Sequence, residues 1–223
     1  MKGRITEVFD SVQGEGIYVG ERQLFVRFFG CNLACKFCDT KSERFTEYQP
    51  QELFAELKLY ADDYHSVSFT GGEPLLQKDF LKEILQLTHK GGFKNYLETN
   101  GTLAAELGEV IDYLDIVAMD IKLPSSTGSF PYWRAHQEFL KTASLKEVFV
   151  KMVICHSTRV EDIINALGLV KEVNPAATII LQPDSAGEPL ALDRKIEYFK
   201  MLSEDHSLVS CAIPQMHKII GVP

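Results

Sequence analysis

Three cysteines lie close together near the start of the chain, at Cys31, Cys35 and Cys38. Their C-x3-C-x2-C spacing directly follows an apolar run that is typical of a β-strand, so the thiols are expected on a loop at a strand end. Thiolates this close can converge on one soft metal centre, and three of them leave a fourth coordination position open. The pattern favours an iron–sulfur cluster over a zinc site completed by His65 or His156, or over reduced structural thiols.

A second group of unusual residues is Thr70-Gly71-Gly72-Glu73-Pro74, which follows the next apolar run. Glycines let backbone groups approach a ligand closely, and a carboxylate there can pair with an ammonium group. Alone, this stretch would indicate an ordinary glycine turn. Beside the cysteines, it indicates part of a binding site.

The other two cysteines, Cys155 and Cys211, stand alone within apolar runs and are expected to be small buried hydrophobic residues. Five cysteines are an odd number, which does not indicate a disulfide framework. His156 and Trp133 fall in no motif and are expected to be structural.

Short β-branched and aromatic runs alternate along the chain with longer stretches of helical periodicity. The runs predict strands at Leu24–Phe29, Ser66–Thr70, Asn95–Glu98, Asp115–Met119, Val148–Ile154 and Thr178–Leu181. The periodic stretches predict helices at Gln51–Tyr60, Asp79–His89, Leu103–Tyr113, Tyr132–Ala143, Val160–Val173 and Leu192–Leu202.

Six successive strand-then-helix units predict an α/β fold with a parallel sheet and right-handed crossovers. Chemically unusual residues follow every strand, which is typical of barrels that build a site from all their strand ends. Six strands are fewer than a closed barrel needs, so a partial (β/α)6 barrel is expected. A hairpin-like N-terminal extension and a late strand at Leu208–Ile213 would complete a single domain over residues 1–223.

The composition is that of a globular protein, because 24% of residues are charged and 45% are hydrophobic. The formal net charge of −8 argues against binding to nucleic acid or to a membrane surface, since both favour positively charged proteins. Apolar stretches are only as long as strands, and no signal-like run follows Met1. A cytoplasmic location is therefore expected.

The cysteine spacing, with an aromatic residue before the last cysteine, resembles the cluster loop of the radical S-adenosylmethionine (SAM) superfamily, here residues 30–40. The resemblance implies that the three cysteines hold a [4Fe-4S] cluster and that SAM occupies the open iron position. In that superfamily a 5′-deoxyadenosyl radical made from SAM removes a substrate hydrogen, while the protein supplies position and excludes water.

Several further motifs, in order, resemble the 7-carboxy-7-deazaguanine synthase family: Gln13-Gly14-Glu15-Gly16, Arg27, Cys38-Asp39-Thr40, Leu97-Glu98-Thr99-Asn100-Gly101, Gln182-Pro183 and Gln215-Met216-His217-Lys218. The resemblance implies conversion of 6-carboxy-5,6,7,8-tetrahydropterin to 7-carboxy-7-deazaguanine with loss of ammonia, on the route to queuosine. It also implies a homodimer, Mg2+ beside the substrate, and an electron donor such as flavodoxin or ferredoxin.

The family pattern implies a role for each matching position. Substrate would contact Val12, Gln13, Gly14, Glu15, Arg27, Thr70, His217 and Pro223. SAM would contact Phe37, Cys38, Asp39, Gly72, Glu73, Asp120, Ile121, Lys122, Gln182, Pro183, Asp184 and Ser185. The hydroxyl of Thr40 would bind Mg2+, a cation that prefers oxygen ligands. The chain departs from the pattern at Asp120-Ile121-Lys122, where many members carry Ser-Pro-Lys.

Residue chemistry bears on some of these positions. Arg27 lies between Val26 and Phe28 in a predicted strand, where it either faces inward toward an anion such as the substrate carboxylate or faces solvent. Glu15 lies between glycines and could accept from the amino-pyrimidine edge of a pterin, or belong to a solvated turn. The apolar tail, residues 214–223, is expected to close the site, with the Pro223 carboxylate near the substrate.

Two other functions share the cysteine triplet. A glycyl-radical-enzyme activase would act on a partner protein, but such activases usually carry His-Asn where this chain has Asp39-Thr40. A zinc-stabilised interaction module would leave Thr70–Pro74 and Gln13–Gly16 unexplained.

Overall fold

The computed structural model describes residues 1–38, 43–60, 63–185 and 189–222. These residues form one sheet, in the spatial order β3-β1-β2-β4-β5-β6-β7-β8-β9. Its strands are β1 (Gly3–Val12), β2 (Arg22–Phe28), β3 (Thr46–Tyr48), β4 (Ser66–Gly71), β5 (Asn95–Thr99), β6 (Ile116–Asp120), β7 (Glu147–Ile154), β8 (Ile179–Pro183) and β9 (Ser210–Ala212).

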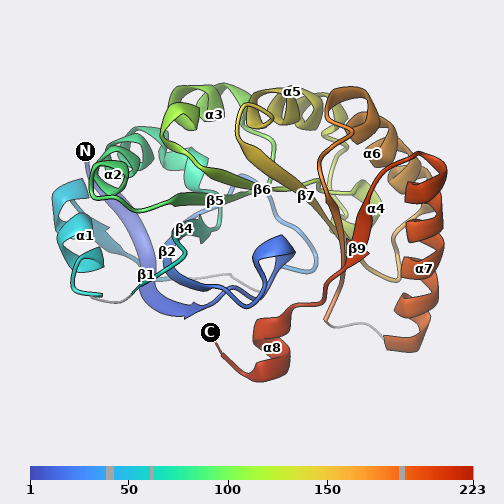
Figure 1. Ribbon diagram of the computed structural model, residues 1–223, viewed down its shortest axis with the longest axis horizontal. Coiled ribbons are helices and arrows are strands. Elements are labelled where there is room, and N and C mark those ends of the chain that lie inside the picture. The colour runs from blue at the N-terminus through green and yellow to red at the C-terminus, as the bar shows by residue number, and fades with distance from the viewer. Residues whose placement is uncertain (39–42, 61–62, 186–188, 223) are drawn as a thin grey trace.

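The helices are α1 (Pro50–Leu57), α2 (Lys78–Lys90), α3 (Ala104–Val110), α4 (Pro124–Thr127), α5 (Trp133–Ala143), α6 (Val160–Val173), α7 (Pro189–Asp205) and α8 (Met216–Ile220). Short 3-10 turns lie at Gly16–Tyr18, Pro74–Gln77 and Ile111–Tyr113. Helices α1, α2, α3, α5, α6 and α7 follow the outer side of the curved sheet, whereas α8 lies on the other side (Figure 1).

The sheet has the predicted topology. Strands β2, β4, β5, β6, β7, β8 and β9 pair in parallel, and β1 pairs antiparallel with β2 as the expected N-terminal hairpin. Six of the parallel strands are each followed by an outer helix, and the described sheet ends at β3 on one edge and β9 on the other. The prediction of a partial (β/α)6 barrel with a late extra strand is confirmed.

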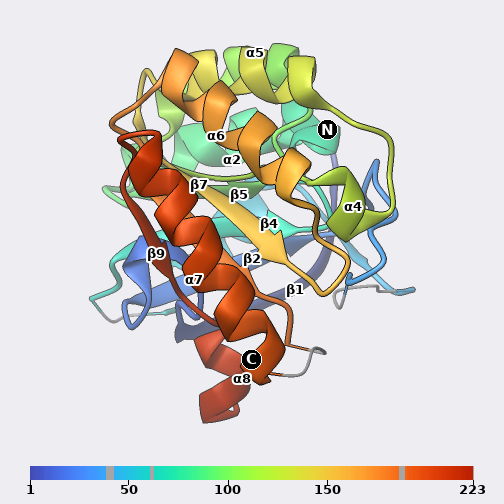
Figure 2. The same ribbon diagram turned by 90° about the vertical axis from the view of Figure 1, so that its right-hand side faces the viewer.

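Alternation along the strands separates the core from the inner face. In β7, Val150 and Met152 are fully buried between sheet and helices, whereas Lys151 points to the other face. The same alternation in β6 buries Val117 and Met119 and places Asp120 on the inner face. Figure 2 shows the helices of the outer layer stacked against one side of the sheet. The inner face is thus where polar side chains gather.

Candidate active site

A pocket of about 460 Å³ opens on the inner face of the sheet. Side chains near the C-terminal ends of six neighbouring parallel strands line it, each at an inward-facing position: Arg27, Thr70, Glu98, Asp120, Lys151 and Gln182. The cysteine loop lies at one end of the pocket, and residues from the β1–β2 loop and the C-terminal segment lie at the other. We call these the cysteine end and the tail end.

All three cysteines of the triplet line the cysteine end. The Cys31 thiol accepts hydrogen bonds from the backbone N–H of Leu33 at 3.4 Å and from Asn100 Nδ2 at 3.8 Å. Burial raises the pKa values of the Cys31 and Cys35 thiols, so metal binding there must displace protons.

Among the described residues, no group of three or more His, Cys, Asp or Glu side chains is arranged to hold a single metal ion. In a [4Fe-4S] cluster each thiolate binds a different iron, so its thiolates lie farther apart than those around one ion. Three thiols at one end of the pocket suit a cluster that each of them would bind through a separate iron.

The Gly71-Gly72 turn packs directly against the start of the cysteine loop. Gly72 N–H donates to the Phe28 carbonyl at 3.0 Å, and Glu73 N–H donates to the Gly30 carbonyl at 2.8 Å. A Cβ atom on Gly72 would lie 2.0 Å from the Gly30 oxygen, and Gly71 has a φ of +119°. Glycines are required here because two backbone segments touch.

Glu73 is fully buried behind this turn. Its carboxylate accepts hydrogen bonds from Thr99 Oγ1 at 3.0 Å, from Asn100 N at 2.8 Å and from Leu75 N at 3.1 Å. Burial raises the pKa of Glu73 to about 7, although these hydrogen bonds and the charge of Lys122 oppose the rise. A cation bound nearby would return Glu73 to its ionised form.

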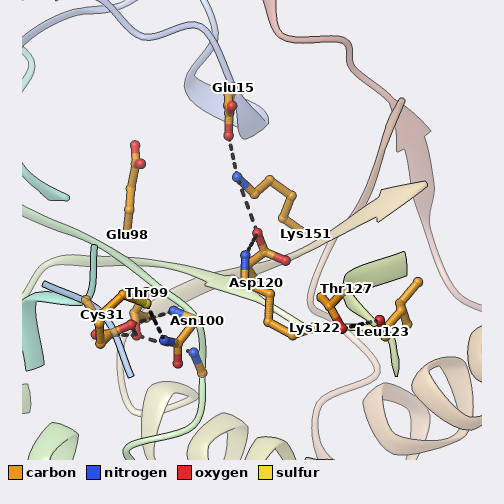
Figure 3. A network of polar contacts seen from close by, with 12 residues as sticks. Glu15, Cys31, Glu98, Thr99, Asn100, Asp120, Lys122, Leu123, Thr127 and Lys151 are labelled. Carbon is orange, nitrogen blue, oxygen red and sulfur yellow. Dashed lines mark hydrogen bonds and ion pairs between the residues drawn. The ribbon is translucent and has the colours of Figure 1, made fainter. Parts of the chain in front are cut away.

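Four charged side chains alternate in sign across the pocket (Figure 3). Glu15 pairs with Lys151, Lys151 Nζ lies 3.6 Å from Asp120 Oδ2, and the same oxygen lies 2.8 Å from Lys122 Nζ. Lys122 Nζ also lies 5.5 Å from the centre of the Phe37 ring. This charged row connects the tail end of the pocket to the cysteine end.

Glu98, on β5, organises the wall beside this row. It accepts hydrogen bonds from Thr70 Oγ1 at 2.7 Å, from Gln13 Nε2 at 2.8 Å and from Ser68 Oγ at 3.4 Å. Gln13 in turn accepts from the backbone N–H of Glu15 at 3.0 Å. Glu98 therefore fixes residues of β4 and of the β1–β2 loop relative to each other.

The C-terminal segment docks on the β1–β2 loop at the tail end. Met216 N–H donates to the Gly14 carbonyl at 2.8 Å, and Gln215 Nε2 donates to Glu15 Oε1 at 2.8 Å. His217 packs so closely on Gly14 that a Cβ there would lie 2.2 Å from His217 Nδ1. Two segments about 200 residues apart in the chain thus form one wall of the pocket.

Arg27 faces the pocket, with 20% of its side chain exposed. Its Nε donates to Glu7 Oε1 at 2.5 Å, and its guanidinium lies 5.3 Å from the centre of the Phe9 ring. Glu7 lies opposite Arg27 in the regular part of the β1–β2 pairing, and the register shifts only beyond Glu7, toward Ile5. The inward orientation left open by the sequence is the one adopted.

The structure brings most of the predicted site residues together. Of the described ones, those that line the pocket are Val12, Gln13, Gly14, Glu15, Arg27, Cys31, Cys35, Phe37, Cys38, Thr70, Gly72, Asp120, Lys122, Gln182, Asp184 and His217. Glu73, Ile121, Pro183 and Ser185 do not line it. Asp39, Thr40 and Pro223 lie outside the described residues.

Two of the residues behind the pocket have other contacts. Ile121 is fully buried in the apolar core, because it follows Asp120 and alternation turns its side chain to the outer face. Ser185 is exposed and accepts a hydrogen bond from Lys218 Nζ at 2.9 Å.

Two buried acceptors at the cysteine end fit a polar ligand. Asp120 Oδ1 and Gln182 Oε1 have no hydrogen-bond partner among the described residues, although both side chains line the pocket. A buried acceptor without a partner costs free energy that a ligand donor can recover. The residues present therefore fit SAM, which carries amino and hydroxyl donors, beside a cluster held by the three cysteines.

The sequence reasoning missed the roles of Lys151 and Glu98. Lys151 interrupts the apolar run Val148-Phe149-Val150-Lys151-Met152-Val153-Ile154, so a buried, paired charge could have been inferred there as it was for Arg27. Glu98 was part of a quoted motif but had no assigned contact.

Comparison with known proteins agrees with the site. Residues 25–184 match the radical SAM superfamily. The chain is 35% identical to a 7-carboxy-7-deazaguanine synthase of Geobacter sulfurreducens, over 97% of this chain and 96% of that protein. It is 32% identical to a 7-carboxy-7-deazaguanine synthase of Archaeoglobus fulgidus, over the full length of both.

Solved structures show the same fold. The crystal structure of QueE from Escherichia coli superposes with a TM-score of 0.68 and 23% identity, covering 95% of this chain and 94% of that one. Streptococcus suis SuiB bound to S-adenosylmethionine superposes with a TM-score of 0.59 and 18% identity, covering 82% of this chain and 48% of that one. The chain belongs to the radical SAM superfamily and, within it, to the family of 7-carboxy-7-deazaguanine synthases.

Proposed function

We propose that this protein converts 6-carboxy-5,6,7,8-tetrahydropterin to 7-carboxy-7-deazaguanine with loss of ammonia, in the biosynthesis of 7-deazapurines such as queuosine. The observation that carries the proposal is a single pocket with three cysteines at one end and the carboxylates of Glu15 and Glu98 toward the other. The family relationship supplies the reaction, and the pocket supplies groups suited to both reactants.

The superfamily implies a [4Fe-4S] cluster and SAM. In this chain Cys31, Cys35 and Cys38 would hold the cluster, and the unpartnered oxygens of Asp120 and Gln182 would accept hydrogen bonds from SAM. When bound, the cluster and SAM supply a 5′-deoxyadenosyl radical that removes a hydrogen atom from the substrate. Glu73 would act indirectly, by fixing the Gly71-Gly72 turn and the Asn100 loop through its buried hydrogen bonds.

At the tail end, the pocket offers both charges that the substrate needs. The guanidinium of Arg27 would hold the substrate carboxylate, a planar group that arginine can bind bidentately. Glu15 would accept from the amino-pyrimidine edge, and Thr70 and His217 would line the ring. Residues 214–223 would close the site against water as part of a single domain over residues 1–223, with the terminal carboxylate of Pro223 at the substrate.

Further parts of the proposal follow from the family. Mg2+ would bind the hydroxyl of Thr40 and an oxygen of the substrate. The enzyme would be a cytoplasmic homodimer that receives electrons from a flavodoxin or a ferredoxin. Among the described residues, no helix is long and apolar enough to cross a membrane.

Anaerobic reconstitution tests the proposal directly. The purified protein is loaded with iron and sulfide and incubated with SAM, reductant, Mg2+ and 6-carboxytetrahydropterin, and the products are identified by mass. We expect 7-carboxy-7-deazaguanine and about four iron atoms per chain, as a [4Fe-4S] cluster requires. SAM cleavage without conversion of the pterin would contradict the substrate, and zinc in place of iron would contradict the class.

Cysteine variants provide matched controls within the same experiment. Replacement of Cys31, Cys35 or Cys38 by alanine should abolish cluster content and SAM cleavage. Cys155→Ala should preserve both, because Cys155 is buried at the end of β7 and does not line the pocket. Full cluster content in any of the three triplet variants would contradict the ligand assignment.

A further inference from the structure

Lys151 lies between two carboxylates that come from different parts of the chain (Figure 3). Its ammonium pairs with Glu15, from the loop after β1, and lies 3.6 Å from Asp120 Oδ2, at the end of β6. All three side chains are largely buried: the exposed fraction is 17% for Lys151, 17% for Glu15 and 9% for Asp120. The three groups therefore interact in an environment that screens charge weakly.

The two partners do not depend on Lys151 equally. Asp120 has another cation at closer range, since Lys122 Nζ lies 2.8 Å from Asp120 Oδ2. The carboxylate of Glu15 has Lys151 as its ion-pair partner and Gln215 as a neutral donor. Loss of the Lys151 charge would consequently affect Glu15 more than Asp120.

We propose that Lys151 is a positioning residue for substrate binding. It holds the Glu15 carboxylate, at the tail end of the pocket, in a fixed position relative to Asp120, which lies toward the cysteine end. The substrate named here rests on the proposed function. Transfer of a hydrogen atom requires reactants held at close range, and small displacements reduce its rate strongly. Lys151 would link the two halves of the pocket through one rigid strand.

The surroundings of Glu15 give this proposal a specific signature. Besides Lys151, the titratable groups that interact with Glu15 are His217 in the C-terminal segment and Tyr96 on β5. Asp120 on β6 and Glu98 on β5 act on Lys151 from the other side. Burial by itself raises the pKa of Glu15. The charge and hydrogen bond of Lys151, helped by Gln215 and His217, nevertheless lower that pKa to about 2.

Without the ammonium, Gln215 and His217 still oppose the effect of burial, but the strongest opposing interaction is lost, so the pKa of Glu15 should rise. A protonated Glu15 is a poorer acceptor for the amino-pyrimidine edge. The variant Lys151→Met should therefore show a new loss of kcat/KM on the acid side of its pH profile. A side chain with a purely structural role would lower kcat/KM equally at every pH.

The experiment compares Lys151→Met, Lys151→Arg and the control Lys141→Met, each reconstituted anaerobically with its cluster. Lys141 is on α5, is half exposed, and pairs with Glu138 on the same helix. We expect Lys151→Met to lower kcat/KM for the pterin about 10- to 100-fold, the effect of losing one charge-assisted hydrogen bond. Lys151→Arg should restore most of the lost kcat/KM and should not show the additional loss at acid pH. Lys141→Met should behave as wild type.

A second measurement does not depend on catalysis. The free energy of unfolding in urea is compared for wild type, Lys151→Met, Glu15→Gln and the double variant. We expect the two substitutions to be strongly non-additive, because each removes the same ion pair. Additive effects, or a Lys151→Met pH profile with the wild-type shape, would overturn the proposal.

The two levels of inference remain distinguishable. If wild-type enzyme cleaves SAM but leaves the pterin unchanged, the proposed substrate fails, and the unfolding cycle still decides whether Lys151 holds Glu15. If wild type converts the pterin and the cycle is additive, the proposed function stands and the role of Lys151 is rejected.

Discussion

The Glu73 carboxyl group is fully buried behind the pocket, and this burial controls its charge. Burial favours its neutral form, with a pKa of about 7 against an ordinary value of 4.5. A carboxyl group whose folded-state pKa is raised stabilises the fold fully at low pH, and this contribution is lost as the pH rises toward 7. Ligands with an ammonium group would reverse the preference by stabilising the carboxylate.

We therefore predict a pH-dependent effect of Glu73→Gln on protein without cluster or SAM. Between pH 4.5 and about 7, the wild-type protein should lose stability relative to the variant, by about 3 kcal/mol in total. Urea denaturation across this range measures the difference. Glu138→Gln, on α5 and half exposed, is the control, and stability curves of identical shape for wild type and Glu73→Gln would contradict the prediction.

At the scale of single residues, the sequence indicates which side chains line the pocket but not all of their contacts. Spacing was sufficient for Cys31, Cys35 and Cys38, because three thiols within eight residues have few structural uses. It was insufficient for Glu7, which lies opposite Arg27 in the pairing of β1 with β2, and for Ile121, whose side chain alternation turns into the core. Such contacts depend on strand pairing, which periodicity does not specify.

At the level of elements, the site depends on backbone segments that touch. Strand β4 ends at Gly71, and the turn that follows lies against Gly30 at the end of β2. Any side chain at position 72 would force these two strand ends apart. The position of the cysteine loop is consequently coupled to the turn after β4.

Gly72→Ala should therefore reduce cluster content and SAM binding by separating these segments, with a loss of at least about 1 kcal/mol in the free energy of unfolding. Gly108→Ala is the matched control, since it lies in α3 and a Cβ there has open space. That variant should be stabilised by up to about 1 kcal/mol, as helix propensity predicts. Equal cluster content and stability in the two variants would contradict this coupling.

The pairing of β1 with β2, which sets Glu7 opposite Arg27, leads to a second prediction at this level. Arg27→Lys should weaken pterin binding by about 1.5–3 kcal/mol, because an ammonium cannot bind a carboxylate bidentately and cannot keep both the substrate and Glu7. SAM binding should change little. Both affinities are measured on reconstituted enzyme, with Arg134→Lys on the exposed face of α5 as control. If Arg27→Lys weakened pterin binding and SAM binding equally, Arg27 would not be a specific contact of the substrate.

The predicted bounds agree best with the structure for elements that are long enough to show several periods of apolar residues. The helix at Val160–Val173 has the predicted bounds, and the six predicted parallel strands all occur within two residues of their expected limits. Helix α4 and strand β3, which are four and three residues long, were not predicted. Segments this short have no full period, and their structure depends on tertiary contacts such as the hydrogen bond from Lys36 N–H to the Thr127 carbonyl.

On the scale of the whole molecule, the pocket is closed by contacts between the two ends of the chain. The C-terminal segment contributes Gln215 and His217, and the β1–β2 loop contributes Gly14 and Glu15. Helix α8 itself is short and exposed (Figure 1). Its position depends on a few hydrogen bonds, so this wall should be the part of the site that opens most easily.

Removal of residues 215–223 should accordingly raise KM for the pterin about tenfold or more while cluster content stays the same. The estimate corresponds to two lost hydrogen bonds of about 1 kcal/mol each. Steady-state kinetics and iron analysis of the truncated enzyme test it, with Ile219→Ala, at a position that is 66% exposed, as the control. An unchanged KM would mean that this segment has no part in substrate binding.

Because the cysteine loop and the closing segment lie at opposite ends of the chain, a ribosome makes them about 180 residues apart. At the usual rate of translation, this separates them by roughly 10 to 35 seconds. During that interval β2 and β4 can already pair and present the three thiols, while the wall that contains Gln215 and His217 does not yet exist. The wall of the pocket that Gln215 and His217 form is thus completed only after the rest of the described pocket has been synthesised.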